Sequence, residues 1–171
     1  EENRRSVASL LRFGKVSIAL FGDLSWDKER ELSCPVGKLG HVNLLIVTQH
    51  GSKISSNPAS IADMHPDIAL MGMGGKKGGD EDPIKLIQAS PGLMGFWQTH
   101  ESFAHPAWGA SDKNMVANLN PPPAAIASQA KAMFTVPPDQ GFAIHAEITK
   151  DGKITMTNDR NGFSKTYQAA P

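Results

Sequence analysis

The stretch "VNLLIVTQHGS", residues 42–52, decides the fold prediction because an apolar run stops abruptly within it. Residues 42–48 have the almost continuous apolar pattern of a strand that is buried on both faces of a sheet. The residues that follow are Gln49, His50, Gly51 and Ser52. Side chains at strand ends often line a cleft in α/β folds. His50 is therefore either an ordinary turn residue or a group aimed at a metal ion or a substrate.

The same pattern recurs on both sides of this stretch. "VSIALF" (16–21) ends in Gly22-Asp23, and "DIALMGM" (67–73) ends in a glycine-rich loop. Helix signals between the strands predict helices from Ser25 to Cys34-Pro35, from Asn57-Pro58 to about His65, and from Asp82-Pro83 onward, with a further short strand at 96–99. This alternation predicts an α/β fold with a mixed sheet and flanking helices.

Both ends of the chain carry hairpin signals. "SVASLLRF" and "VSIALF" flank Gly14-Lys15, and "FAIHAEITKDGKITMTN" (142–158) predicts a second hairpin. In the second hairpin a three-residue loop at 150–152 sets Ile148 opposite Ile154 and Ala146 opposite Met156. Residues 103–140 are broken by prolines, although 124–133 could form one helix. We therefore expect one domain with a core (1–102), an irregular insertion (103–140) and a C-terminal hairpin and tail (141–171).

The bulk composition excludes several function classes. The 171 residues carry 17 basic and 17 acidic side chains, so the net charge is zero, and no nucleic-acid partner is expected. No apolar stretch reaches the roughly 18 residues that cross a bilayer, so no membrane partner is expected either. The single cysteine excludes an intramolecular disulfide and a multi-cysteine zinc site. No signal-peptide pattern opens the chain, and both a cytoplasmic and an exported location stay open.

Several motifs together carry a family resemblance. "NRRSVASLLRFGKVSIALFGDLSWDKERELSCP" (3–35), followed by "VTQHGS" (47–52), resembles the second half of a metallo-β-lactamase-fold hydrolase of the competence-protein-like bacterial branch. Further stretches of that branch resemble "MGMGGKKGG", "SPGLMGFWQTH" and "NGFSKTY". The resemblance implies an α/β fold that is half of a metallo-β-lactamase-like αββα sandwich, with the C-terminal β-hairpin added.

The resemblance also implies a metal site. In that superfamily the aspartate of "GDL" bridges two metal ions and the histidine before the glycine binds one of them, roles that fall on Asp23 and His50. A zinc ion held there would activate water to attack an ester, a phosphoester or an amide. Gln49 stands where the branch has another histidine, and the chain contains no H-x-H motif. Catalytic zinc sites use about three protein ligands, so we expect weak or substoichiometric zinc, or no metal.

Other residues are candidates for the same site. A third metal ligand could come from His41, His100 or His105. Substrate contacts are expected from Gln49, Ser52, Lys76 and Lys77. The glycine-rich loop at 74–79 either offers amide groups and two cations to an anion or is a solvated loop. It is not a P-loop, because no Ser or Thr follows the lysines.

Two other functions stay open. Cys34 could act as a nucleophile without any metal, with His41 or His50 as its base and Asp23 behind the imidazole, or it is a small thiol at a helix end. The chain could instead be a catalytically inactive fragment that serves as a binding or assembly module.

A second copy of the chain is the expected partner, besides a small-molecule or peptide substrate. In the resembled fold, the other half would cover the apolar faces of "SVASLLRF", "VSIALF" and "NLLIVT". Leaving about 600 Å² of such surface wet would forgo roughly 15 kcal/mol. Residues 103–140 and the final hairpin could fold back over the sheet, or two chains could pair. The proline-broken insertion favours a homodimer.

Overall fold

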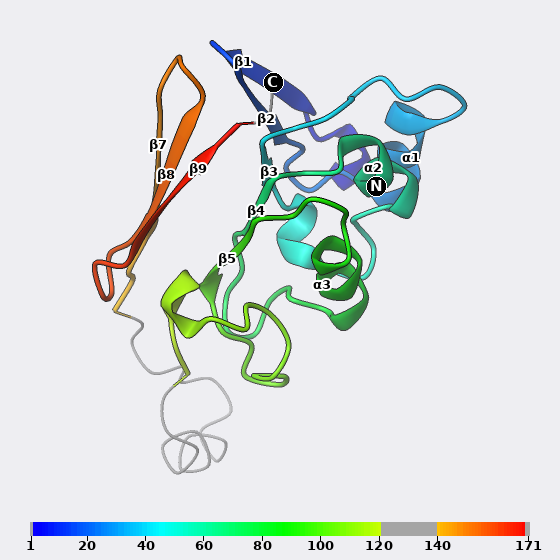
Figure 1. Cartoon of the computed structure of the whole chain (residues 1–171). Coiled ribbons are helices and arrows are strands. Elements are labelled where there is room, and N and C mark those ends of the chain that lie inside the picture. The colour runs from blue at the N-terminus through cyan, green and yellow to red at the C-terminus, as the bar shows by residue number, and fades with distance from the viewer. Residues whose placement is uncertain (1, 121–139, 170–171) are drawn as a thin grey trace.

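The computed structural model describes residues 2–120 and 140–169, and it has three layers (Figure 1). The central layer is a six-stranded mixed sheet with the strand order β1-β2-β3-β4-β5-β6. The α-helices cover one face of this sheet, and a three-stranded antiparallel sheet, β7-β8-β9, covers the other. The predicted α/β class and mixed sheet are confirmed.

The central sheet is built from strands that the apolar pattern predicted, with one addition. Its strands are β1 (Ser9–Phe13), β2 (Val16–Leu20), β3 (Leu44–Ile46), β4 (Ile68–Met71), β5 (Gly95–His100) and β6 (Val116–Asn118). β1 pairs antiparallel with β2, and the other pairs are parallel. The predicted hairpin is confirmed, because Phe13 pairs with Val16 across the loop and Gly14 takes a φ of 59°. β6 lies in the segment that was predicted to be irregular, and it was missed.

The α-helices of the described residues lie at or close to the positions that their cap signals predicted. They are α1 (Trp26–Ser33), α2 (Pro58–Met64) and α3 (Glu81–Gln88), and the short 3-10 helices are η1 (Glu2–Arg5), η2 (Thr48–Gly51) and η3 (Lys113–Met115). Asn57 caps α2 by accepting the N–H of Ala59 at 2.9 Å. The Ser25 hydroxyl donates to Asp27 instead of capping α1. α3 begins earlier than Asp82-Pro83 predicted, with Asp80 at its N-cap. The helix predicted over 124–133 lies outside the described residues.

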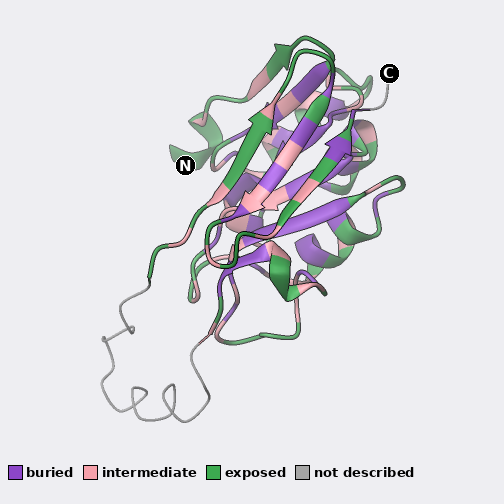
Figure 2. Cartoon of the chain, turned by 60° about the vertical axis from the view of Figure 1, so that its left-hand side comes forward, coloured by how far each residue is buried: buried purple, intermediate pink, exposed green. Residues whose placement is uncertain are grey.

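The C-terminal sheet contains the predicted hairpin and one further strand. Its strands are β7 (Ile144–Ile148), β8 (Lys153–Asn158) and β9 (Ser164–Gln168). Ile148 pairs with Ile154 and Ala146 with Met156, so the predicted register is confirmed. β9 was missed, because the sequence analysis predicts only a tail after the hairpin at 142–158. Buried residues alternate along β8 with exposed or half-buried ones, as Figure 2 shows from the outer side of the sheet.

The buried face of this C-terminal sheet packs on the central sheet. Ile154, Met156 and Tyr167 contact a cluster that includes Val16, Leu44, Ile68 and Trp97. The Trp97 Nε1–H donates to the Tyr167 hydroxyl at 2.9 Å. A second chain is therefore not needed to cover this face. The homodimer prediction assumed that this face is uncovered, whereas the chain's own β7-β8-β9 sheet covers it over β2 to β5. Leu11 and Phe13 of β1 stay exposed.

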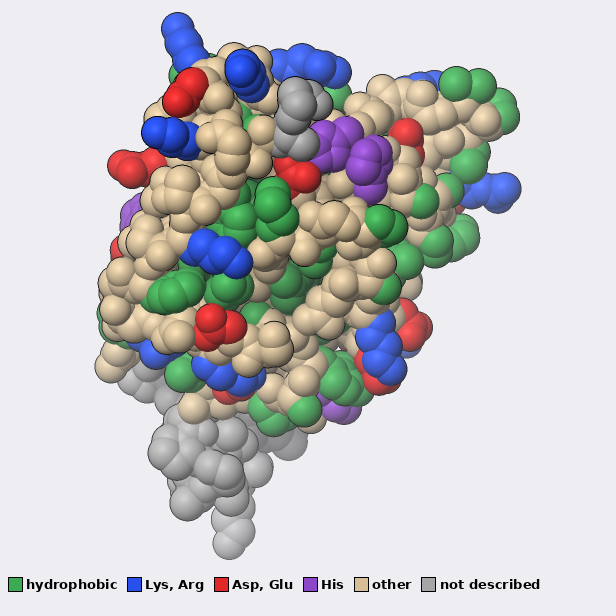
Figure 3. All heavy atoms as spheres, in the orientation of Figure 1, with side chains coloured by type: hydrophobic (Ala, Val, Ile, Leu, Met, Phe, Trp, Pro, Cys, Tyr) green, Lys and Arg blue, Asp and Glu red, His purple; other side chains and the backbone are tan. Residues whose placement is uncertain are grey.

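The surface carries charges of both signs. Figure 3 shows basic and acidic side chains interspersed over the face that it presents, in keeping with the net charge of zero. Within residues 2–120 and 140–169, no helix is long and apolar enough to cross a membrane.

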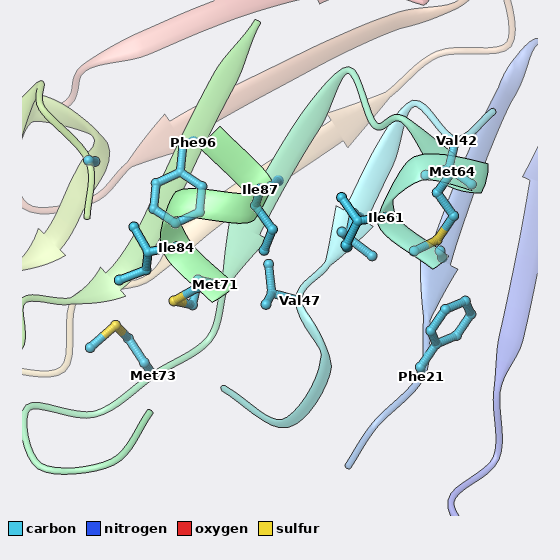
Figure 4. Packing of buried hydrophobic residues seen from close by; sticks show 14 of the residues in the cluster. Phe21, Val42, Val47, Ile61, Met64, Met71, Met73, Ile84, Ile87 and Phe96 are labelled. Atoms are coloured by element: carbon cyan, nitrogen blue, oxygen red, sulfur yellow. The ribbon is translucent and has the colours of Figure 1, made fainter. Parts of the chain in front are cut away.

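The helices bury their apolar sides against the other face of the central sheet. Ile61 and Met64 of α2 and Ile84 and Ile87 of α3 point toward the strands, where Figure 4 shows them beside side chains such as Val47. Val47 directly precedes the turn that contains His50, so this core anchors the end of β3. The polar residues after β3 therefore extend from a rigid base.

Candidate functional site

Asp23 and His50 follow two neighbouring parallel strands. Asp23 comes after β2 and Gly22, and His50 lies in η2 immediately after β3. Because β2 and β3 run parallel, their C-terminal ends meet at the same edge of the sheet. His50 Nε2 lies 3.6 Å from Asp23 Oδ1, and both side chains are about one-third exposed (34% and 39%). The structure thus brings together the two residues that the sequence singled out as metal ligands.

The backbone around His50 takes an unusual path. Gln49 and His50 have φ values of 48° and 60°, and Gly51 follows with 70°. Left-handed backbone costs a residue with a side chain roughly 1–2 kcal/mol, so neighbours must hold it in place. The Gln49 N–H donates to the Gly22 carbonyl at 2.9 Å, and the Gly79 N–H donates to the His50 carbonyl at 2.9 Å. The turn is held from β2 on one side and from the glycine-rich loop on the other.

The imidazole of His50 has a defined tautomer when it is neutral. Its Nδ1 lies 2.6 Å from the carbonyl oxygen of Gly72. A carbonyl only accepts, so Nδ1 carries the hydrogen and Nε2 keeps its lone pair. Metal-binding histidines commonly have this arrangement, with the outer N–H fixed by a carbonyl. Nε2 and the Asp23 carboxylate are then two acceptors that face each other, and a proton or a cation between them would satisfy both.

The spacing of these two acceptors fits half of a zinc site. Two ligand atoms on one tetrahedral zinc ion, at bond lengths of about 2.0–2.1 Å, lie about 3.3 Å apart. The 3.6 Å between His50 Nε2 and Asp23 Oδ1 is close to this value. In the part of the chain that the structure describes, no group of three His, Cys, Asp or Glu side chains could hold a metal ion. The pair would supply at most two of the about three protein ligands that a catalytic zinc site uses.

The three histidines that were predicted as candidates for a third ligand have other contacts. His41 pairs with Asp67 at 2.9 Å, the His100 Nδ1–H donates to the Glu101 carbonyl at 2.6 Å, and the His105 ring stacks on Trp108 at 3.6 Å. His41 precedes β3, so it lies at the opposite end of that strand from His50.

An open cavity adjoins Asp23. It has a volume of about 770 Å³ and is lined by Glu2, Asn3, Arg5, Ser6, Gly22 and Asp23. A substrate or a further polypeptide segment could reach the Asp23 carboxylate from this side. The N-terminal η1 helix forms one wall of the cavity, and Arg5 contributes a positive charge to it.

The glycine-rich loop packs against His50 and borders a second cavity. A Cβ at Gly78 would lie 2.1 Å from the His50 carbonyl oxygen, so only glycine allows this approach. The cavity has a volume of about 300 Å³, and its lining includes Lys76, Asp80 and His105. Lys76 and the neighbouring Lys77 are exposed. The predicted substrate-binding lysines therefore lie on the loop that contacts His50.

The remaining predicted site residues lie apart from the Asp23–His50 pair or are turned inward. The Gln49 side chain is 8% exposed, and its Oε1 has no hydrogen-bond partner among the described residues. Ser52 Oγ accepts the backbone N–H of Ile54 at 3.4 Å. Cys34 is half-buried at the end of α1, and no hydrogen bond joins its thiol to His41 or His50 in residues 2–120.

One buried acidic residue near the site was missed. Glu29 lies in the first turn of α1 and is 1% exposed. Burial raises the pKa of its carboxyl group, while the Thr48 hydroxyl and the Asn57 and Ser56 N–H groups lower it by less. The available signal was its spacing: Glu29 and Ser33 lie one helical turn apart on the buried side of α1.

Comparisons with known proteins assign no function to this site. No protein-family model matches the chain, and neither the curated proteins nor the solved structures contain a significant match.

Proposed function

We propose that Asp23 and His50 are the chemical centre of a hydrolase of the metallo-β-lactamase superfamily, acting on an ester, a phosphoester or an amide. The observation that carries the proposal is the 3.6 Å approach of His50 Nε2 to Asp23 Oδ1, with Nδ1–H fixed by the Gly72 carbonyl. Two parallel strands that deliver these two residues to one sheet edge support the superfamily assignment. So does the sandwich-like layering of helices and two sheets.

In this proposal Asp23 and His50 hold a zinc ion weakly. When bound, the ion would supply the Lewis acidity that activates water near neutral pH. The Gly72 carbonyl keeps the Nε2 lone pair of His50 directed at the site, and the Asp23 carboxylate supplies the negative charge that a cation needs. The 770 Å³ cavity beside Asp23 provides access for the substrate or for a further ligand.

The glycine-rich loop favours an anionic group on the substrate. Lys76 lines the 300 Å³ cavity, and Gly78 brings this loop against His50. The carboxylate of Asp80 in the same cavity accepts the N–H of Lys53 at 2.7 Å, which offsets part of its charge. Among the three ester, phosphoester and amide classes, a phosphoester matches this cation best.

Zinc titration by calorimetry tests the proposed ligands. We expect weak binding to the wild-type chain and a loss of at least about tenfold in affinity for Asp23→Asn and for His50→Ala. The chain offers a matched control, because His145 on β7 forms an exposed pair with Asp159 at 2.8 Å on the C-terminal sheet. His145→Ala should leave the affinity unchanged. Equal losses at His50 and His145 would show surface binding and contradict the proposal.

Hydrolysis assays with chromogenic esters, phosphodiesters and anilides distinguish the mechanisms. The proposal requires an activity that a chelator removes, that zinc restores, and that Asp23→Asn and His50→Ala abolish. An activity that survives the chelator but disappears in Cys34→Ser would establish the thiol mechanism instead. Zinc binding without hydrolysis of any substrate class would identify a binding module.

A further inference from the structure

Glu29 is a buried carboxyl group without a cationic partner. It is 1% exposed, and no salt bridge reaches it among residues 2–120 and 140–169. Burying such a group without an ion pair is unfavourable, so α1 carries it at a cost in stability. A hydrophobic residue or an alanine at this position would avoid that cost. The contacts that the carboxyl group makes must therefore explain why it is buried at this position.

Those contacts join α1 to the start of α2 and to the end of β3. Glu29 Oε2 accepts the backbone N–H of Asn57, the N-cap of α2, at 2.8 Å. The backbone carbonyl of Glu29 accepts the Ser60 hydroxyl at 2.6 Å. The Thr48 hydroxyl also lies beside the carboxyl group. Oε1 is buried and has no hydrogen-bond partner in the described residues.

Thr48 is the first residue of the turn that contains His50. Its carbonyl accepts the Ser55 hydroxyl at 3.0 Å, and Ser55 precedes Ser56, which has a φ of 59°. The segment 55–57 and the turn 48–51 are thus packed against each other, and Glu29 contacts both. Two left-handed residues, Gln49 and His50, follow Thr48 directly. A turn with this strain keeps its shape only if its surroundings hold it.

We propose that Glu29 is a positioning residue for His50: by holding Asn57 and Thr48, it fixes the left-handed turn that sets His50 Nε2 against Asp23. The role of Glu29 in catalysis rests on the proposed function. Its effect on the turn does not, and that effect can be tested separately. In the alternative role, Glu29 only joins α1 to α2, and its loss would weaken the whole domain equally.

Hydrogen exchange separates the two roles, because three amide N–H groups report on the turn. Gln49, Gly79 and Asp80 donate to the carbonyls of Gly22, His50 and Gly51, each at 2.9 Å. In Glu29→Ala, the buried Asn57 N–H loses its acceptor, and we expect protection at these three amides to fall at least about tenfold relative to amides of β8. In Glu29→Gln, the amide oxygen still accepts from Asn57, so protection should stay within about threefold of wild type.

Asn158→Ala is the matched control for a general loss of stability. Asn158 is fully buried and donates to the carbonyls of Asn114 and Val116, at 2.7 and 2.9 Å, far from the turn in the sequence and on the other sheet. This variant should lower protection in β8 and leave the ratio between turn amides and β8 amides unchanged or raised. If Glu29→Ala does not fold, Glu29→Asp replaces it, because the shorter side chain withdraws the carboxylate from Asn57.

Zinc affinity gives the functional readout of the same variants. It should fall in Glu29→Ala in parallel with protection of the turn and recover in Glu29→Gln. A uniform loss of protection throughout Glu29→Ala, or no recovery in Glu29→Gln, would overturn the inference. If the wild-type chain binds no zinc, the proposed function fails while the exchange experiment still decides the role of Glu29. Intact protection of the turn in Glu29→Ala, with zinc bound by the wild type, would overturn the inference alone.

Discussion

Gly78→Ala tests the contact between the glycine-rich loop and His50. Gly78 has a φ of 82°, and a Cβ placed there would lie 2.1 Å from the His50 carbonyl oxygen and 2.6 Å from the His50 Cβ. Gly92 provides a matched control, because it has a φ of 84° and a Cβ there would meet no atom within 4 Å. The two substitutions thus place a side chain at nearly the same positive φ, and only one of them creates a collision.

The expected magnitudes follow from this difference. Alanine in the left-handed region costs roughly 1–2 kcal/mol, so Gly92→Ala should lower the free energy of unfolding by about that amount. Gly78→Ala should lose the same amount plus about 1–3 kcal/mol for forcing side chain and backbone apart, about 2–5 kcal/mol in total. The entropy that alanine removes from the unfolded chain is the same in both variants and cancels in the comparison.

Urea denaturation measures both free energies, and zinc titration measures the consequence for the site. Because the collision involves the backbone of His50, Gly78→Ala should displace Nε2 and weaken zinc binding, whereas Gly92→Ala should bind zinc like the wild type. Equal stability losses together with unchanged zinc affinity in both variants would show that the glycine-rich loop does not pack against His50.

Three further outcomes are expected. Burial raises the folded-state pKa of Glu29 above 4.5, so its contribution to stability is fully present below that pH and is lost as pH rises through the folded-state pKa. Glu29→Gln should therefore gain stability over the wild type as pH rises to neutrality in a series of urea titrations, and a constant difference would contradict the buried carboxyl. Tyr167→Phe leaves the buried Trp97 Nε1–H without its acceptor and should cost about 1–3 kcal/mol, seen as a lower melting temperature. Ile154→Ala should lower the free energy of unfolding by about 2–5 kcal/mol in chemical denaturation. Ile54→Ala, at a residue that is 55% exposed, should lower it much less. Similar losses in the two variants would mean that β8 does not pack on the central sheet.

Local patterns in the sequence were sufficient for most helices and strands. The N-cap and proline of α2, the Gly14-Lys15 loop and the register of Ile148 with Ile154 were all predicted, and the structure confirms them. These features depend on backbone preferences of a few adjacent residues and on the two-residue period of a strand. β6 escaped prediction because it is a three-residue strand in a segment dominated by loop signals.

The pairing of Asp23 with His50 could also be anticipated from the sequence. Each follows an apolar run, and parallel strands bring their C-terminal ends together. The 3.6 Å separation and the hydrogen bond from His50 to Gly72 could not be anticipated, because they depend on a left-handed turn at residues that are not glycine. Such a conformation is held by distant contacts, including that from Gly79, and local sequence does not encode it.

The tertiary structure alone decided what covers the face of the central sheet that lies opposite the helices. The apolar pattern of residues 16–21 and 42–48 determined that this face had to be covered, and a second chain or the C-terminal segment would have satisfied that pattern equally. Ile154, Met156 and Tyr167 of the same chain occupy it. Only the tertiary structure shows that Gln49 is buried and that Glu29 is buried near the turn that contains His50. The hydrophobic effect has no direction, so a sequence specifies which surfaces leave water, and packing of the whole chain selects the surfaces that they meet.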